Sequence, residues 1–301
     1  MSGNFYVNCA AKRKNTGIGN RCQDLGPIAG FMITPYGWSD TEENVRLKST
    51  FDTAIQADDD ERIYPFPPIL NMTNNSEETV YQELALGRLF VKNGKTILQF
   101  ALKSSRYKHE AMKSHSLQQC GVIIFDQQNR LQGIKEDGLF KTINLQEFVV
   151  EKLQLNDGAG VATHSLISMV FEDPEAFETS PAVISGLEWS ANSLEGLIDV
   201  NIDVVADTPA LTGLSITCAV DKMGDAFNPV GPTTEPVTLG DIVIKNAAGV
   251  TQTITSVTSE NGTAVIVTTL TAGTYTVNFY DPADMVTKGY ESIGSASFTV
   301  S

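Results

Sequence analysis

The sequence VYQELALGRLFVKNGKTILQFALKSSRYKHEAMKSHSLQQCGVIIFDQQNRLQGI, residues 80–134, contains the elements around which the rest of the chain is organised. Two apolar, β-rich runs meet at Asn93-Gly94, a dipeptide typical of the type I′ hairpin turn because both central residues need a positive φ. A polar, helix-like segment follows at 107–119, and a second hairpin is predicted around residues 126–129. This order of strand, strand, helix, strand and strand predicts a sheet that carries one helix.

The composition is that of a globular chain with room for one large domain or two ordinary ones: 301 residues, 42% hydrophobic and 19% charged. No apolar run reaches the length of about eighteen residues that a membrane span needs. The first residues lack the apolar segment of a secretory signal, which predicts folding in a cytoplasm. Cys9, Cys22, Cys120 and Cys218 are widely spaced without a C-x-x-C pair, which predicts reduced thiols rather than disulfides or a metal site.

The net charge of −15 is unevenly spread, because residues 181–301 hold only 3 Lys or Arg residues against 13 Asp or Glu. Binding nucleic acid through a basic patch needs cations that displace counterions from the phosphates. The charge balance therefore argues against such binding, although solubility alone would also account for an acidic surface.

The N-terminal part predicts an arm, a strand and a helix. Lys12, Arg13 and Lys14 cluster in an N-terminal loop or arm, which is either solvated or in contact with an acidic neighbouring subunit. A strand is expected at 26–35. A helix is expected at 39–57, with Ser39 as its N-cap and Glu42 completing a capping box.

Residues 58–61 are all acidic and predict a solvated loop just beyond this helix, since they lack the ligand spacing of an EF-hand. Residues 62–68 contain three prolines and are expected to be extended. The polar segment NMTNNSEE, residues 71–78, predicts a long loop used for contacts. The candidate contact residues there are Asn71, Asn74, Asn75, Glu77 and Glu78.

Three near-motifs fail on spacing or context. Gly94-Lys95-Thr96 resembles the end of a P-loop, but position 89 is Leu and the context is strand–turn–strand. His109-Glu110 begins a zincin-like HExxH, yet position 113 is Lys. His164-Ser165 has no nucleophile elbow around it. The sequence therefore predicts no catalytic, cofactor-binding or metal-binding residues, and an enzyme is the least favoured class.

The C-terminal half changes character after a strand pair predicted at 139–155 and 161–171. Its acidic, proline-containing residues 172–181 mark a boundary, so the predicted domains are 1–180 and 197–301, joined by a linker at 181–196. About seven short strands between turns predict an immunoglobulin-like β-sandwich for 197–301. There Tyr275 and Val277 lie on the expected buried face, and Ala272-Gly273-Thr274-Tyr275 is similar to the approach to a tyrosine corner.

Four segments of the first domain carry a resemblance to a known family. They are RIYPFPPILNMTNNSEETVYQELALGR (62–88), FVKNGKTILQFAL (90–102), the helix-like YKHEAMKSH (107–115) and CGVIIFDQQNRLQG (120–133). In layout they resemble bacteriophage tail-tube (major tail) proteins, in which two packed sheets flank a helix and a long loop reaches a neighbour. An acidic Ig-like domain on the outside of the tube also occurs in some of these proteins. The resemblance is one of layout and contains no diagnostic motif.

The resemblance implies a mainly β chain, with a tail-tube-like two-sheet domain that has one or two helices and a C-terminal Ig-like sandwich. It implies a structural virion protein, assembled in the host cytoplasm, whose subunits form stacked rings, expected to be hexamers. The rings would line a conduit through which DNA passes without specific binding. The N-terminal cations and the 71–78 segment would then contact the next ring, and no cofactor would be needed.

Two other functions fit the same sequence features. One is another virion component, either a capsid decoration or a head–tail connector protein that contacts other virion proteins. The other is an Ig-like adhesin or carbohydrate-binding protein, for which Trp189 would serve.

Overall fold

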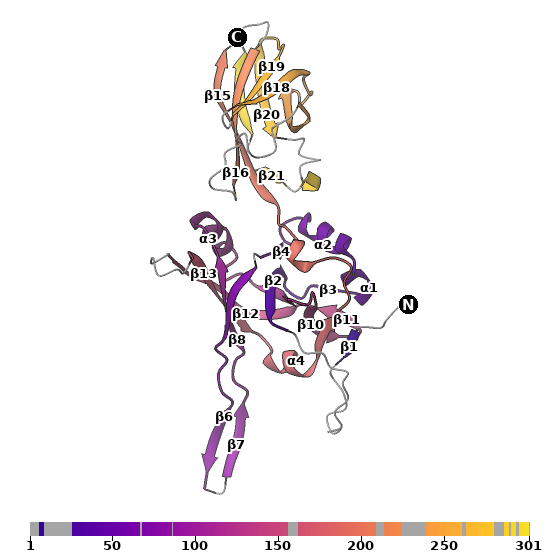
Figure 1. Ribbon diagram of the computed structural model, residues 1–301, viewed down its shortest axis with the longest axis vertical. Helices are drawn as coiled ribbons and strands as arrows, with labels where there is room; N and C mark the ends of the chain where they lie inside the picture. The colour runs from indigo at the N-terminus through magenta and orange to yellow at the C-terminus, as the bar shows by residue number, and fades with distance from the viewer. Residues whose placement is uncertain are drawn as a thin grey trace. The chain divides into compact units, whose positions relative to one another are not determined.

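A computed structural model describes residues 6–8, 26–66, 68–85, 87–155, 162–208, 214–223, 239–260, 263–279, 286–288, 290–292 and 295–300. The chain is mainly β, which confirms the expected fold class, and it divides into two compact units, Met1–Gly196 and Leu197–Ser301 (Figure 1).

The described strands of the first unit are β1 (Tyr6–Asn8), β2 (Ile28–Pro35), β3 (Ser39–Asp40), β4 (Tyr64–Pro65), β5 (Ile69–Asn74), β6 (Val80–Leu84), β7 (Gly87–Lys92), β8 (Ile97–Lys103), β9 (Cys120–Asp126), β10 (Leu131–Glu136), β11 (Leu139–Lys141), β12 (Ile143–Gln154), β13 (His164–Phe171) and β14 (Pro181–Ile184). Its described helices are α1 (Glu42–Val45), α2 (Lys48–Ile55), α3 (Arg106–Lys113), α4 (Pro174–Thr179) and the 3-10 turn η1 (Ala191–Ser193).

All of these strands except β6 and β7 form one 12-stranded sheet. Its main path runs β1-β14-β10-β9-β12-β13-β8-β5, and β2, β3, β4 and β11 join beside it. Strand β12 links the two halves, because its first residues pair with β9 and the remainder with β13. Two register shifts, at Leu145/Glu147 and Val150/Leu153, interrupt the pairing with β13. Such bulges bend a strand, so β12 passes from one of the two expected layers into the other and joins them.

The core lies between these two layers. Phe31 of β2 packs against Phe100 of β8 with ring centroids 5.2 Å apart, and Phe66 contacts both Phe31 and Phe148. Every residue of β9 is buried, whereas β8 alternates between buried and half-buried positions. Full burial of such side chains contributes about 1.5–3 kcal/mol each, so this aromatic cluster helps to hold the layers together.

Several expected elements are present at their predicted positions. The strand at 26–35 is β2, and the hairpin around 126–129 is β9–β10. The strand expected at 139–155 is divided: β12 pairs with β13, the strand expected at 161–171, whereas residues 139–141 form the separate strand β11, which pairs with β10. The helix expected at 107–119 is α3, which is shorter and has Ser105 as its N-cap. The turn predicted at 156–158 lies outside the described residues.

The single helix expected at 39–57 is wrong. Ser39 pairs with Lys141 in the β3–β11 ladder and therefore cannot act as an N-cap. Thr41 caps α1 instead, by accepting a hydrogen bond from the Asn44 amide at 3.3 Å. Leu47 is extended and separates α1 from α2. The acidic residues 58–61 do follow α2 in a turn, as expected.

The hairpin predicted at Asn93-Gly94 is also wrong. Strand β7 pairs with β6, while β8 pairs with β5 and β13. Neither Asn93 nor Gly94 has a positive φ. Gly94 instead lies directly against Glu77, because a Cβ added to Gly94 would fall 2.0 Å from the Glu77 carbonyl oxygen. The glycine is needed for this close approach and not for a turn.

Replacing Gly94 with alanine should therefore destabilise the first unit. The new Cβ would force the backbone at Glu77 away, and overpacking of this kind typically costs about 1–3 kcal/mol. Gly196→Ala is the matched control, because an added Cβ there meets no atom closer than 3.9 Å. Urea unfolding of both variants measures the difference, and equal unfolding free energies would contradict the close approach at Gly94.

The linker expected at 181–196 is wrong as well, because these residues belong to the first unit. Strand β14 pairs with both β10 and β1. Trp189 packs on Phe51 with ring centroids 5.0 Å apart, and its indole Nε1 donates a hydrogen bond to the Arg46 carbonyl at 2.8 Å. Composition marked a boundary here, but pairing and aromatic packing hold the segment in place.

The second unit contains two sheets in its described part, with strand orders β18-β19-β16-β15-β21 and β17-β20-β22. The strands are β15 (Ile198–Thr208), β16 (Leu214–Met223), β17 (Ile242–Asn246), β18 (Ile254–Glu260), β19 (Thr263–Thr268), β20 (Gly273–Phe279), β21 (Tyr290–Ser292) and β22 (Ala296–Val300). Tyr275 and Val277 are buried as expected, and the Tyr275 hydroxyl donates to the Thr271 carbonyl at 2.8 Å. The Ig-like assignment stays a prediction.

Candidate functional site

A long two-stranded extension projects from the sheet of the first unit (Figure 1). The ladder between β5 and β8 continues beyond both strands, because the Asn75 amide donates to the Ile97 carbonyl and the Glu77 amide to the Lys95 carbonyl, both at 2.9 Å. Beyond this ladder the β6–β7 hairpin pairs only with itself. We call the described residues of 75–95 the arm.

One face of the arm carries an aromatic pair and an ion pair. Tyr81 lies opposite Phe90, and Glu83 lies opposite Arg88. The two rings meet edge to face with centroids 6.2 Å apart, and the Arg88 Nη2 to Glu83 Oε1 distance is 3.1 Å. These contacts place all four side chains on the same face. Tyr81 and Phe90 are nevertheless each 52% exposed.

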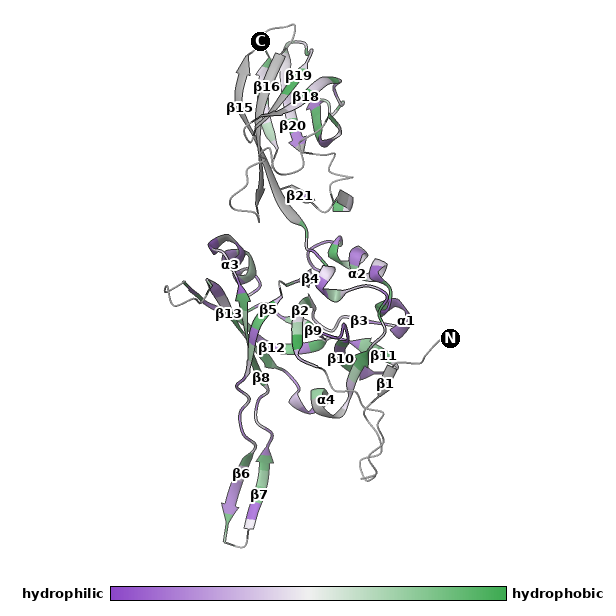
Figure 2. Ribbon diagram, viewed as in Figure 1, coloured by the Kyte–Doolittle hydropathy of each residue, from purple (hydrophilic) through white to green (hydrophobic). Residues whose placement is uncertain are grey.

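The opposite face of the arm carries aliphatic side chains beside the polar Gln82. Because side chains alternate along a strand, Val80 and Leu84 of β6 point away from Tyr81, and Leu89 of β7 points away from Phe90. All three are exposed to water, and no residue of β6 or β7 is buried. Figure 2 shows hydrophobic residues along this hairpin as well as in the buried strands.

A hairpin with apolar side chains on both faces is not suited to water. An isolated two-stranded ribbon is marginal in stability, and a sheet face that stays in water is normally polar. Contiguous exposed apolar surface usually marks a contact with another molecule. The arm is therefore the strongest candidate for a functional surface in the described part of the chain.

The contact residues expected from sequence lie partly at the base of this arm. Asn71 and Asn74 belong to strand β5, so the loop predicted for them is wrong. Asn75, Glu77 and Glu78 do lie between strands and are exposed. Lys12, Arg13 and Lys14 lie outside the described residues.

A hollow of about 520 Å³ lies at the arm's base. Two of the expected contact residues, Asn74 and Glu77, line it together with Lys95 of the returning chain. Apolar side chains of the body, among them Ile28 and Phe177, complete its wall. The structure thus brings part of the expected contact set to one place.

Sequence reasoning missed the arm's own apolar residues. The run Leu89-Phe90-Val91 was the available signal, since consecutive apolar positions are typical of a strand covered on both faces. This run suggested a strand buried within the subunit, whereas the described part of the subunit covers neither face of the β6–β7 hairpin.

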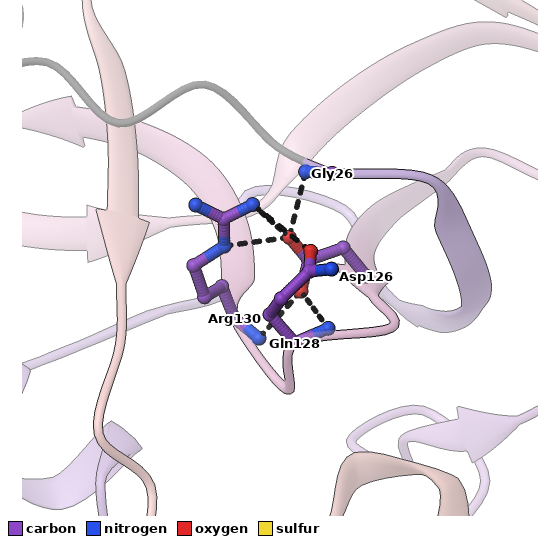
Figure 3. Close-up of polar contacts among 4 residues, drawn as sticks. All are labelled: Gly26, Asp126, Gln128 and Arg130. Carbon is purple, nitrogen blue, oxygen red and sulfur yellow. Dashed lines mark hydrogen bonds and ion pairs between the residues drawn. The ribbon is translucent and has the colours of Figure 1, made fainter.

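A second site of dense polar contacts, at Asp126, is structural in character (Figure 3). The fully buried carboxylate accepts hydrogen bonds from the backbone amides of Gln128 and Arg130 at 2.9 Å and of Gly26 at 2.8 Å. Arg130 Nε donates to it at 2.6 Å. Burial alone would raise the pKa of Asp126, but the hydrogen bonds and charge of Arg130, with the Gly26 amide, lower it. Asp126 therefore joins the β9–β10 turn to the start of β2.

Two further reactive groups, His109 and Cys120, are held in structural roles. The Nδ1 atom of buried His109 lies 2.9 Å from Ser165 Oγ, a pair that their spacing in the sequence did not suggest. Because Ser165 is itself fully buried, we assign this pair a structural role. Burial raises the pKa of the Cys120 thiol to about 11, which keeps it protonated at neutral pH.

Two further properties concern metal sites and membrane spans. Within the described ranges, no three His, Cys, Asp or Glu side chains gather as a metal site would require. None of the helices described here has the length and apolar character of a membrane span.

Comparison with models of known protein families gives no match for this chain, and no curated protein sequence matches it significantly.

Proposed function

We propose that this chain is a structural subunit that assembles with copies of itself, as a tail-tube protein of a bacteriophage does. The observation that carries the proposal is the arm, whose aromatic and aliphatic faces are both exposed in the isolated subunit. Such a surface becomes stable when neighbours cover it. A subunit of this kind needs no catalytic group.

The sheet edge supports the same reading. Strand β5 is the last strand on the main path of the sheet, and β8 is its only partner in the described residues. Leu70 and Met72 on β5 are exposed. An edge with free hydrogen-bonding groups and apolar side chains tends to pair with another chain, so neighbouring subunits can continue one sheet.

The expected assembly follows from the kind of contact involved. The arm and the surface that receives it differ, so the contact is heterologous and repeats from one subunit to the next. Such contacts close into rings or extend into filaments. Stacked rings, expected to be hexamers in a virion, would enclose a conduit for DNA, and the chain's net charge of −15 would keep DNA from adhering.

Electron microscopy of the purified full-length protein over a range of concentrations tests the proposal. Rings or tubes are expected to appear as the concentration rises. Persistence of monomers at high protein concentration, at both low and high salt, would rule out self-assembly as the function of the arm.

A further inference from the structure

The first unit has a locally basic surface despite the chain's net charge of −15. It is formed by α3 and the strand ends beside it, and its exposed cations are Lys103, Arg106, Lys108, Lys113 and Lys152. In the described part of the chain, none of these five side chains forms an ion pair with a carboxylate.

This surface is hollowed. A depression of about 570 Å³ lies between α3 and β12, and Arg106, Lys113 and Lys152 all line it. Glu110 and Glu151 also line it and reduce its positive charge without cancelling it. The surface can therefore receive a small group of carboxylates.

An exposed leucine in a strained conformation follows α3. Leu117 has φ 64° and is 79% exposed. The left-handed region is disfavoured for residues with a Cβ, and glycine is the usual choice just after a helix. Two hydrogen bonds fix this segment to β12, from the Leu117 amide to the Phe148 carbonyl and from the Val150 amide to Ser116 Oγ, both at 2.9 Å. A leucine kept in this conformation and held in water is suited to serve as an anchor in a contact.

The same unit offers a complementary surface. Residues 58–61 are four consecutive exposed carboxylates in the turn after α2. Asp59 forms an ion pair with Arg62 at 3.3 Å. Among the described residues, Asp58, Asp60 and Glu61 have no ion-pair partner.

We propose that the surface of α3 and Leu117 binds the acidic turn 58–61 of a second copy of this chain. The cations would pair with the free carboxylates, while Leu117, which follows α3, supplies an apolar contact beside the charged groups. Nucleic acid is also polyanionic, so binding of duplex DNA is an outcome that the test must distinguish. The contact does not involve the arm, so it is a second interface.

A charge swap tests the pairing directly. Arg106→Glu with Lys113→Glu, both of which line the hollow, and separately Asp58→Lys with Asp60→Lys, should each weaken self-association about tenfold at low salt, since each places like charges opposite one another. Combining all four substitutions should restore association, because the charges are again opposite. Sedimentation velocity of the full chain at about 50 mM and 500 mM salt measures this, and the differences should shrink at high salt.

The substitution Leu117→Gly distinguishes a role of Leu117 in self-association from a role in folding. Glycine relieves the strain, so the melting temperature should hold or rise while association weakens. Leu47→Ser is the matched control, because Leu47 is also an exposed leucine and serine suits its N-cap position. It should leave association unchanged.

Three outcomes would overturn the inference: the four-substitution chain fails to recover, Leu117→Gly associates like the parent, or the parent binds duplex DNA through Arg106 and Lys113. None of these variants changes the arm. If only substitutions in the arm abolish tube assembly, the proposed function is upheld and only the interface at α3 and Leu117 is rejected.

Discussion

Replacing Tyr81 and Phe90 together with serine should abolish assembly while leaving the thermal stability of the subunit unchanged. The two rings touch each other, with centroids 6.2 Å apart, and each is half exposed. The folded subunit therefore loses little when they are removed. Once a neighbour covers them, each ring contributes about 1.5–3 kcal/mol. Their joint loss should weaken each contact by more than about a hundredfold.

The ion pair on the same face provides the control for this experiment. Glu83 and Arg88 are exposed and contact each other at 3.1 Å, and an exposed pair is worth only about 0.2–1 kcal/mol. Replacing both with glutamine should leave assembly nearly intact. Light scattering follows assembly and circular dichroism follows the melting temperature. Equal assembly by the serine and glutamine variants would exclude the aromatic face as a contact.

The aliphatic face calls for a parallel experiment. Leu84→Ser with Leu89→Ser removes two of the three aliphatic side chains named on that face, leaving Val80, without touching the aromatic pair. If neighbours cover both faces of the arm, this variant should fail to assemble as completely as the first. Normal assembly would mean that only the aromatic face is buried, with the arm lying on a single surface.

Replacing Asp126 with alanine should have the largest effect on stability. The substitution removes the acceptor of four hydrogen bonds and leaves the mostly buried Arg130 without its partner. Breaking a buried pair from one side typically costs about 3–5 kcal/mol. Urea unfolding measures the loss. Gln128→Ala is the control, because residue 128 reaches the carboxylate through its backbone amide, which the substitution keeps, and loses only the exposed hydrogen bond from Arg130 Nη2 to Gln128 Oε1 at 3.2 Å.

The same carboxylate predicts a pH dependence. The pKa of Asp126 is lower in the folded chain than in the unfolded chain. Its contribution to stability is therefore complete above the unfolded pKa of about 4 and is lost as the pH falls through the lower folded value. Parent and Asp126→Ala should thus differ most at neutral pH and converge in acid. A difference that stays constant down to about pH 2 would contradict this assignment.

Much of the fold follows from local pattern. The fully apolar CGVIIF run predicted a buried strand, and β9 is buried along its whole length. The alternation around Tyr275 likewise predicted which side chains the second unit buries. In both cases burial is determined by neighbouring residues in the sequence, so the sequence alone is sufficient.

The errors arose where distant residues decide the outcome. Asn93-Gly94 has the local preference of a turn, but the ladder between β5 and β8 draws Gly94 against Glu77. Ser39 has the chemistry of an N-cap, but Lys141 pairs with it in a strand. Neither partner is visible in the local sequence.

The candidate site was the hardest part to predict. Its polar base was expected from the length and composition of the 71–78 segment. Its apolar residues were taken for part of a sheet, because a strand that a neighbouring molecule covers has the same pattern as one that its own chain covers. Only the three-dimensional structure shows that Phe90 and Leu89 are exposed within the subunit.

The sharing of β12 between both halves of the sheet has a consequence for cooperativity. Its first residues are hydrogen-bonded to β9 and its later residues to β13, so neither layer can separate without breaking a strand that the other needs. The aromatic contact between Phe31 and Phe100 would be lost in the same step. The body of the first unit should therefore unfold in one transition, with no stable half-open form for a growing assembly to trap.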